Sequence, residues 1–541
     1  MVVAHDTALH TGTSRPVTST HSSRVLSIAS GTLASRLTGL VRVLVLAYVL
    51  GFTPLADAYN LANTVPNMLF DLVLGGVAGA TFIPVFVERL ALDGERRAFK
   101  SISSVVTAAL ILLVVASGVA WFAAPAIING FTALHHGVGP SANALGDQRA
   151  VATSLLRWFV PQVFFYGVIG VATALLNVRQ RFGAAAWVPV ANNVVCVGVL
   201  IWFHLVDPTP TLDHLRGSSH LLGLGLGTTL GVAVQFLCLV PALARADLWR
   251  LSFRLDLADP ALRAVARLGS WTLAVVVANQ ASLYVVLAFA FGVGGRGPVS
   301  AYTYGWSFMQ MPYAVVVVSV LGALTPQLAG LATARDFAGL GERLRFGLRQ
   351  SLVIILPASV TLVLLAQPTV AILLHHLDAR ATLGAGTVLA VLAAGLPGFT
   401  VFQLCVRGLQ AMQRAREVFI LYAIQNAATI ALAFALGRHS LAGLTASVSI
   451  AYAGAAVLAL GALARHHVSV APAVWSRHVR RSLVASLVAA AAIAATYASS
   501  AATRGGALVE RYLLALAAGA LAFVVVVALA QRRVDRSDRK V

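Results

Sequence analysis

The sequence predicts an all-α polytopic membrane protein with fourteen transmembrane helices, arranged as two six-helix lobes in a parallel repeat plus two C-terminal helices. Three observations predict it: the composition, the length of the apolar stretches and the distribution of arginine. Of 541 residues, 59% are hydrophobic and only 11% are charged, and the mean hydropathy is +0.84. A soluble chain of this length would need more charge to cover its surface.

The apolar residues occur in stretches long enough to cross a bilayer. Residues 101–125 and 512–530 are examples, and a helix of about 20 residues spans the hydrocarbon core. The short alternating strands of a membrane barrel are absent from the sequence pattern. The predicted spans are 25–50, 60–88, 101–128, 151–177, 184–204, 221–245, 264–293, 299–330, 346–376, 384–411, 417–437, 441–464, 481–500 and 511–530.

The positions of lysine and arginine test this span count, because short cytoplasmic loops are enriched in both. With the N-terminus in the cytoplasm, 28 of the 39 fall in cytoplasmic tails and loops, 7 on the outer face and 4 inside spans. The bias persists to the end of the chain, which favours fourteen spans with both termini cytoplasmic. The net charge of +20 then reflects topology and contact with anionic headgroups. No soluble basic domain is present to bind nucleic acid.

A weak internal repeat divides the chain. The Ala-Tyr pair at 58–59 recurs at 301–302, 243 residues later, and Pro84 recurs as Pro326, 242 residues later. The matches lie six spans apart, so the two copies share one orientation, which is a transporter arrangement with the substrate site between the lobes. The predicted divisions are a disordered cytoplasmic tail (1–24), an N-lobe (25–245), a C-lobe (246–465), helices 13 and 14 (466–531) and a basic cytoplasmic tail (532–541).

The first span carries two arginines at mid-depth and beyond, where their side chains cannot easily reach the membrane surface. Ser35 and Arg42 are seven residues apart and share a helix face, whereas Arg36 lies roughly 120° round the helix from Arg42. Because burying an unpaired charge in hydrocarbon is costly, we expect both arginines to line a cavity. Guanidinium groups bind phosphate oxygens through bidentate, charge-assisted hydrogen bonds, so a diphosphate is the natural ligand.

Four further charged residues lie within or at the ends of spans. Arg157 and Arg407 lie near span ends, where snorkelling and function explain them equally well. Asp57 begins the second helix and is either its N-cap or part of a gate. Asp71, in the middle of the same helix, is either an ion-pair partner for a helix 1 arginine or a protonatable coupling group.

Several kinds of chemistry are not indicated. Cys196, Cys238 and Cys405 lie in apolar spans without paired spacing, so neither a metal site nor a disulfide framework is predicted. The chain has no phosphate-binding loop for nucleotide hydrolysis, which excludes a single-chain ATP-driven pump. No cofactor is expected, and transport would draw on the membrane potential or a coupled monovalent ion.

The motifs in the first five spans resemble those of a known family. From Ser35 the chain reads Ser-Arg-Leu-Thr-Gly-Leu-Val-Arg, followed by Ala-Asp-Ala-Tyr-Asn at 56–60, Pro-Asn at 66–67 and Phe-Ile-Pro-Val-Phe at 82–86. Residues 174–182 read Ala-Leu-Leu-Asn-Val-Arg-Gln-Arg-Phe. In this order and spacing the motifs resemble the MurJ (MviN) family of the multidrug/oligosaccharidyl-lipid/polysaccharide exporter superfamily.

The resemblance implies a flippase that moves the peptidoglycan precursor lipid II from the inner to the outer leaflet of the bacterial cytoplasmic membrane by alternating access. It also implies a role in cell-wall synthesis and cell shape, with the cell-wall synthesis machinery as partner. An exporter of another polyprenyl-diphosphate oligosaccharide would need the same cations. A drug/ion antiporter is the other alternative, but it would favour acidic or aromatic cavity residues over arginines.

By position, Ser35, Arg36, Arg42 and Asp57 match functionally important family sites, and Asn67, Asp71 and Gln310 are candidates for gating or coupling. The better-known members add one arginine after the Pro-Asn of helix 2 and another before a proline of helix 8. Here 68–71 and 306–312 contain no arginine. Arg157 or Arg407 would have to compensate.

Overall fold

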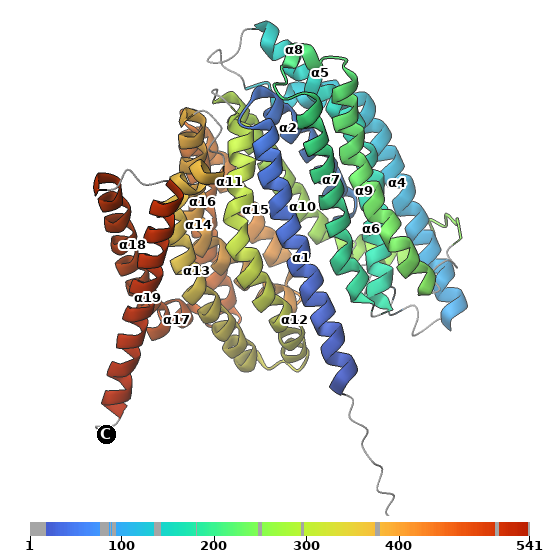
Figure 1. The fold of residues 1–541 in the computed structure, drawn as a ribbon. Coiled ribbons are helices and arrows are strands. Elements are labelled where there is room, and N and C mark those ends of the chain that lie inside the picture. The colour runs from blue at the N-terminus through green and yellow to red at the C-terminus, as the bar shows by residue number, and fades with distance from the viewer. Residues whose placement is uncertain are drawn as a thin grey trace, which may run out of the picture.

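The computed structural model describes residues 18–75, 86, 88, 94–134, 142–179, 181–246, 252–293, 297–373, 379–503 and 508–538, which form helices and no strand (Figure 1). Thirteen of its helical segments are long and apolar enough to cross a membrane. Each matches a predicted span. The remaining span, 60–88, runs into residues outside the described ranges, so the count of fourteen stays a prediction.

The N-terminal elements are α1 (Thr18–Leu50), α2 (Pro54–Phe70), the π-helix η1 (Asp71–Gly75), α4 (Gly94–Phe131), α5 (Ala142–Phe159), α6 (Pro161–Val178), α7 (Phe182–Val206), α8 (Leu212–Leu215) and α9 (Ser219–Arg245). The C-terminal elements are α10 (Pro260–Gly292), α11 (Pro298–Pro312), the π-helix η4 (Tyr313–Val317), α12 (Val318–Thr333), α13 (Phe337–Leu373), α14 (Ala379–Ala411), α15 (Ala415–Leu432), the π-helix η5 (Ala433–Gly437), α16 (Leu441–Arg465), α17 (Ala471–Val474), α18 (Arg477–Thr503) and α19 (Leu508–Asp538).

Several helices extend beyond the predicted spans, including α4, α13 and α19, and two further differences have a local cause. The helix of the first span starts at Thr18 rather than residue 25, because a helix nucleated by an apolar span extends into polar residues at little cost. The rest of the predicted tail, 1–17, lies outside the described residues. The span predicted at 151–177 starts at Ala142 and is broken between α5 and α6 at Pro161, whose ring nitrogen cannot donate a helical hydrogen bond.

The helices pack mainly within two groups, as Figure 1 shows. In the first group α1 lies along α7, α7 along α9 and α2 along α5. In the second, α14 packs between α13 and α16, and α15 packs on α10 and α16. The hairpin of α18 and α19, drawn in red, lies at the edge and contacts α13. Between the groups, α10 contacts α4 and α11 contacts α2.

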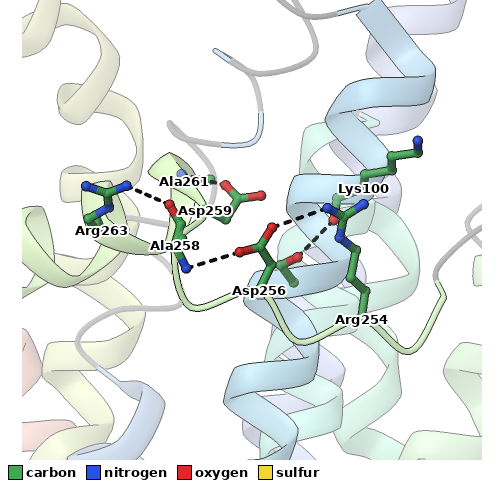
Figure 2. A network of polar contacts seen from close by, with 8 residues as sticks. Lys100, Arg254, Asp256, Ala258, Asp259, Ala261 and Arg263 are labelled. Carbon is green, nitrogen blue, oxygen red and sulfur yellow. Dashed lines mark hydrogen bonds and ion pairs between the residues drawn. The ribbon is translucent and has the colours of Figure 1, made fainter.

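Two hydrogen bonds fix the segment before α10 to α4 of the other group, and Figure 2 shows the polar contacts within this segment. The amides of Ser252 and Arg254 donate to the hydroxyls of Ser103 and Thr107, each at 3.2 Å. Asp256 accepts from the Arg254 side chain at 3.2 Å and from a turn amide at 3.1 Å. The connection between the two groups is therefore bonded to α4. Shortly after these bonds, Asp259 caps α10.

Two of the π-helices recur at equivalent places in the predicted repeat. In one copy η1 follows α2, and in the other η4 follows α11. The first residues of the two π-helices, Asp71 and Tyr313, are 242 residues apart, the same separation as Pro84 and Pro326. The recurrence of a rare element at one offset supports the repeat, and π-helical turns are frequent at functional sites.

Candidate functional site

The two helix groups are joined by a hydrogen-bonded contact between α2 and α11. Asp57 of α2 is 2% exposed and accepts hydrogen bonds from the backbone amide of Ser300 at 2.8 Å and from its hydroxyl at 2.7 Å. Ser300 lies in the first turn of α11, where amides have no partner within the helix. A carboxylate at this position also meets the positive end of the helix dipole. Asp57 therefore caps α11 across the contact between the two groups.

Of the two roles expected for Asp57, the N-cap of its own helix does not occur. Thr53 is the N-cap of α2, and its hydroxyl accepts from the amide of Ala56 at 3.1 Å. At the start of α11 the N-cap is Gly297, which has no side chain to offer. The missing cap is therefore supplied by a residue 243 positions earlier.

Buried residues pack closely around the contact between Asp57 and Ser300. The Asn60 amide donates to the Ser300 hydroxyl at 2.9 Å and to the Tyr304 hydroxyl at 3.4 Å. The rings of Tyr304 and Phe52 lie 5.8 Å apart. Gly297 has a φ of 65° and packs on the backbone of Phe52, where a Cβ would lie 2.5 Å from the Phe52 Cα atom. Any other residue at this position would be strained in its backbone and would collide with Phe52.

A second contact joins α2 to the other group at the π-helix. The Gln280 amide of α10 donates to Asp71 Oδ2 at 3.0 Å. The partner of Asp71 is thus Gln280, and no ion pair joins Asp71 to an α1 arginine within the described residues. The Oε1 atom of Gln280 is buried without a hydrogen-bond partner there. The neighbouring Asn279 accepts from Asn426 of α15 at 2.7 Å, so α10 is bonded to both groups at this level.

The α1 arginines point in different directions, as a regular helix requires. Arg42 is half-buried, and the titratable groups nearest to it are those of Tyr59, Tyr166 and Cys196. The Tyr59 hydroxyl in turn lies 3.2 Å from that of Thr228. No carboxylate is among the groups that act on Arg42 within the described part of the chain.

Arg36 is exposed, and no partner for its side chain is seen in the described ranges. Ser35 lies on the α7 side of α1, where its carbonyl accepts from the Asn193 amide at 3.3 Å. The Asn193 amide also donates to Thr38 at 3.0 Å, which fixes α1 against α7 on the same side as Arg42. One arginine therefore faces a polar environment inside the first group, and the other faces outward from it.

The other predicted residues do not join these contacts. Arg157 is half-buried thirteen residues inside its span, because α5 starts earlier than predicted, and its Nε atom is buried without a partner. Arg407 is exposed on α14 and donates to Gln410 at 3.2 Å. Asn67 is exposed and donates to the Asn63 carbonyl at 2.9 Å. Gln310 is half-buried one turn before η4.

The sequence analysis did not identify the hydrogen-bond partners in these two contacts, which are Ser300, Asn60, Tyr304 and Gln280. One signal for Ser300 was present: it stands 243 residues after Asp57, the offset of the two Ala-Tyr pairs. No cluster of three or more His, Cys, Asp or Glu side chains that could hold a metal occurs among the described residues.

Comparison with solved structures identifies the fold. A structure titled as the lipid II flippase MurJ in an inward closed conformation matches with a TM-score of 0.75 over 94% of this chain and 99% of that one, at 19% identity. An inward-facing MATE-family multidrug resistance transporter of the MOP superfamily matches with a TM-score of 0.65 over 84% and 99%, at 14% identity. The chain therefore has the fold of these transporters.

The sequence comparisons identify the family. The family model described as lipid II flippase MurJ matches residues 46–516, so the chain belongs to the MurJ family. The probable lipid II flippase MurJ of Rhizobium meliloti is 26% identical over 420 residues, which cover 76% of this chain and 74% of that protein. The lipid II flippase MurJ of Burkholderia cenocepacia is 27% identical over 398 residues, covering 72% and 73%.

Proposed function

We propose that this protein is a transporter, not an enzyme, that moves lipid II from the inner to the outer leaflet of the bacterial cytoplasmic membrane. Membership of the MurJ family supports the substrate. One structural observation carries the chemistry: Arg42 lies inside a membrane span among hydroxyl and thiol groups, with no carboxylate acting on it in the described structure. An intramembrane cation without an internal counter-ion favours an anionic ligand, and the diphosphate of lipid II is one.

The contact between Asp57 and Ser300 supplies the gate in this proposal. It joins α2 and α11 where both helices begin, which the topology prediction places at the outer face. While these two bonds hold, the lobes 25–245 and 246–465 are closed on that side. Opening replaces the bonds with water, and the π-helices η1 and η4 provide places where the two helices can bend. Lipid II bound at Arg42 would then be accessible from the inner leaflet while this gate is closed, and from the outer leaflet when it opens.

The direct test follows lipid II itself. In a bacterium depleted of its own flippase, this protein should restore the exposure of lipid II to an impermeant probe added outside the cells. Arg42→Ala should fail at normal protein level, whereas Arg343→Ala, which removes an exposed arginine of α13, should succeed. Export of a different polyprenyl-diphosphate glycan, with lipid II still confined to the inner leaflet, would overturn the assignment of substrate.

The topology and the driving force belong to the same proposal. Both termini are placed in the cytoplasm, and fusions of a cytoplasm-only reporter to either end should therefore be active. Transport in proteoliposomes should respond to an imposed membrane potential or to a gradient of a monovalent ion, since charged groups lie within the membrane field. Insensitivity to both would exclude these two sources of energy. Proteins of the cell-wall synthesis machinery are proposed as partners, which co-purification would test.

A further inference from the structure

The first turns of α18 carry three arginines on one side of the helix. Arg477, Arg480 and Arg481 line a cavity of about 360 Å³ together with Val484 and with Val526 of α19. The charged residues stand at the end of the helix that the topology prediction places at the cytoplasmic face, and the valines lie deeper in the spans. The cavity thus has a cationic mouth and an apolar floor.

This side of α18 faces away from the rest of the protein. Ser482 and Ser486 are buried on the opposite side, where the Ser482 hydroxyl donates to the Val353 carbonyl of α13 at 2.7 Å. At about 100° per residue, Arg480 and Val484 each lie about 160° round the helix from Ser482. The cavity between α18 and α19 is therefore directed to the surrounding bilayer.

The charge in the cavity has no acidic counterpart among the side chains that the structure describes. None of the three guanidinium groups forms an ion pair with an acidic side chain in the described ranges. Guanidinium groups recognise phosphate by bidentate hydrogen bonds, and the amides at the start of a helix add donors of the same polarity. Basic pockets between transmembrane helices on the cytoplasmic side are suited to anionic lipid headgroups.

The surroundings of the cavity match a lipid molecule better than a soluble anion. Below the arginines, α18 exposes Val484 (54%), Leu487 (58%) and Val488 (43%) as an apolar wall. Trp475, two residues before the helix, is 72% exposed, as is typical of an aromatic residue at the headgroup level. A phosphodiester at the arginines would place its acyl chains along this wall.

We infer that the groove between α18 and α19 binds an anionic phospholipid, with its phosphate held by Arg477, Arg480 and Arg481 and its acyl chains on Val484 and Val526. The site is separate from Arg42 and from the contact between α2 and α11. Its occupation does not depend on what the protein transports, so it can be measured in the absence of lipid II.

Native mass spectrometry of the full-length protein in detergent, titrated with phosphatidylglycerol, tests the inference. The triple variant R477Q/R480Q/R481Q should lose one tightly bound lipid, with an affinity about a hundredfold lower, since each of the three cations near the surface contributes a factor of about five. The matched control R343Q/R416Q/R465Q removes three exposed arginines elsewhere and should bind like the wild type. Equal binding by both triple variants would overturn the inference.

Two further measurements decide the nature of the ligand. Inorganic phosphate in large excess should not displace the lipid, and displacement would show a site for a free anion instead. In vesicles of phosphatidylcholine containing phosphatidylglycerol brominated on its acyl chains, Trp475 fluorescence, taken as the difference between the wild type and W475F, should be quenched. Equal quenching by brominated phosphatidylcholine would refute selectivity for the anionic headgroup. The assay does not depend on the folding of any arginine variant.

Discussion

Replacement of Asp57 by alanine should open the proposed outer gate. The change removes the two hydrogen bonds at 2.8 and 2.7 Å and leaves the Ser300 amide without a cap whenever the lobes close. A hydrogen bond to a charged group contributes about 1.5–3 kcal/mol, and in the open state water replaces both. A loss of about 3 kcal/mol for the pair changes the ratio of closed to open molecules by a factor of about 150.

Cysteine labelling measures this ratio. Ala301 follows Ser300 in α11 and is only 4% exposed, so a cysteine there should react with an impermeant maleimide only when the contact opens. The measurement uses right-side-out vesicles and a protein whose three native cysteines are replaced by alanine. If opening is fast and rare, the labelling rate should rise about a hundredfold in Asp57→Ala. Asp57→Asn keeps an acceptor oxygen and should give an intermediate rate.

A matched control uses Thr333 at the far end of α12. Its side chain is exposed and bonds to the Ala329 carbonyl one turn earlier, so Thr333→Ala should leave the labelling rate unchanged. If Asp57→Ala folds with normal thermal stability and labels at the wild-type rate, the two hydrogen bonds do not hold the gate, and the reasoning fails.

Three other predictions concern neighbouring residues. Arg42→Lys keeps the charge but loses the planar fork, so it should fail to restore growth in a strain depleted of flippase, although Arg343→Lys succeeds. Gly297→Ala should lower the melting temperature and speed labelling at the gate, because the added Cβ collides with backbone at a φ of 65°; unchanged values would refute this. Asp71→Asn still accepts from Gln280 and should retain transport, whereas Asp71→Leu should lose it. Loss in both would show that the charge of Asp71 is needed.

The membrane spans could be predicted because each depends on local sequence. Apolar length and the arginine bias located thirteen of the described helices to within a few residues at most ends. The break at Pro161 follows from the missing amide hydrogen of proline, which the span prediction did not take into account. Helix geometry alone also gave the different directions of Arg36 and Arg42. These features are fixed by neighbours within one or two turns.

The partners of the polar residues could not be predicted in the same way. Asp57 has the sequence context of an N-cap, but Thr53 already fills that role, and the helix that lacks a cap is far along the chain. Gln280 lies in an apolar span of α10 with no local sign that it meets Asp71, 209 residues earlier. Capping rules predict which residue types cap a helix and at which end. Which helix a given side chain caps depends on how the lobes pack.

The repeat also explains why the two copies differ at the gate residue itself, although the Ala-Tyr pairs that follow it match. Asp57 and Ser300 are separated by the offset of the two Ala-Tyr pairs, so they occupy equivalent positions, and they touch. Two equivalent atoms can touch only close to the axis that relates the copies. A carboxylate in both copies would put two like charges within hydrogen-bonding distance, which is strongly unfavourable. One copy must therefore supply the acceptor and the other the donors, so the repeated sequences have to differ at the axis where the lobes meet.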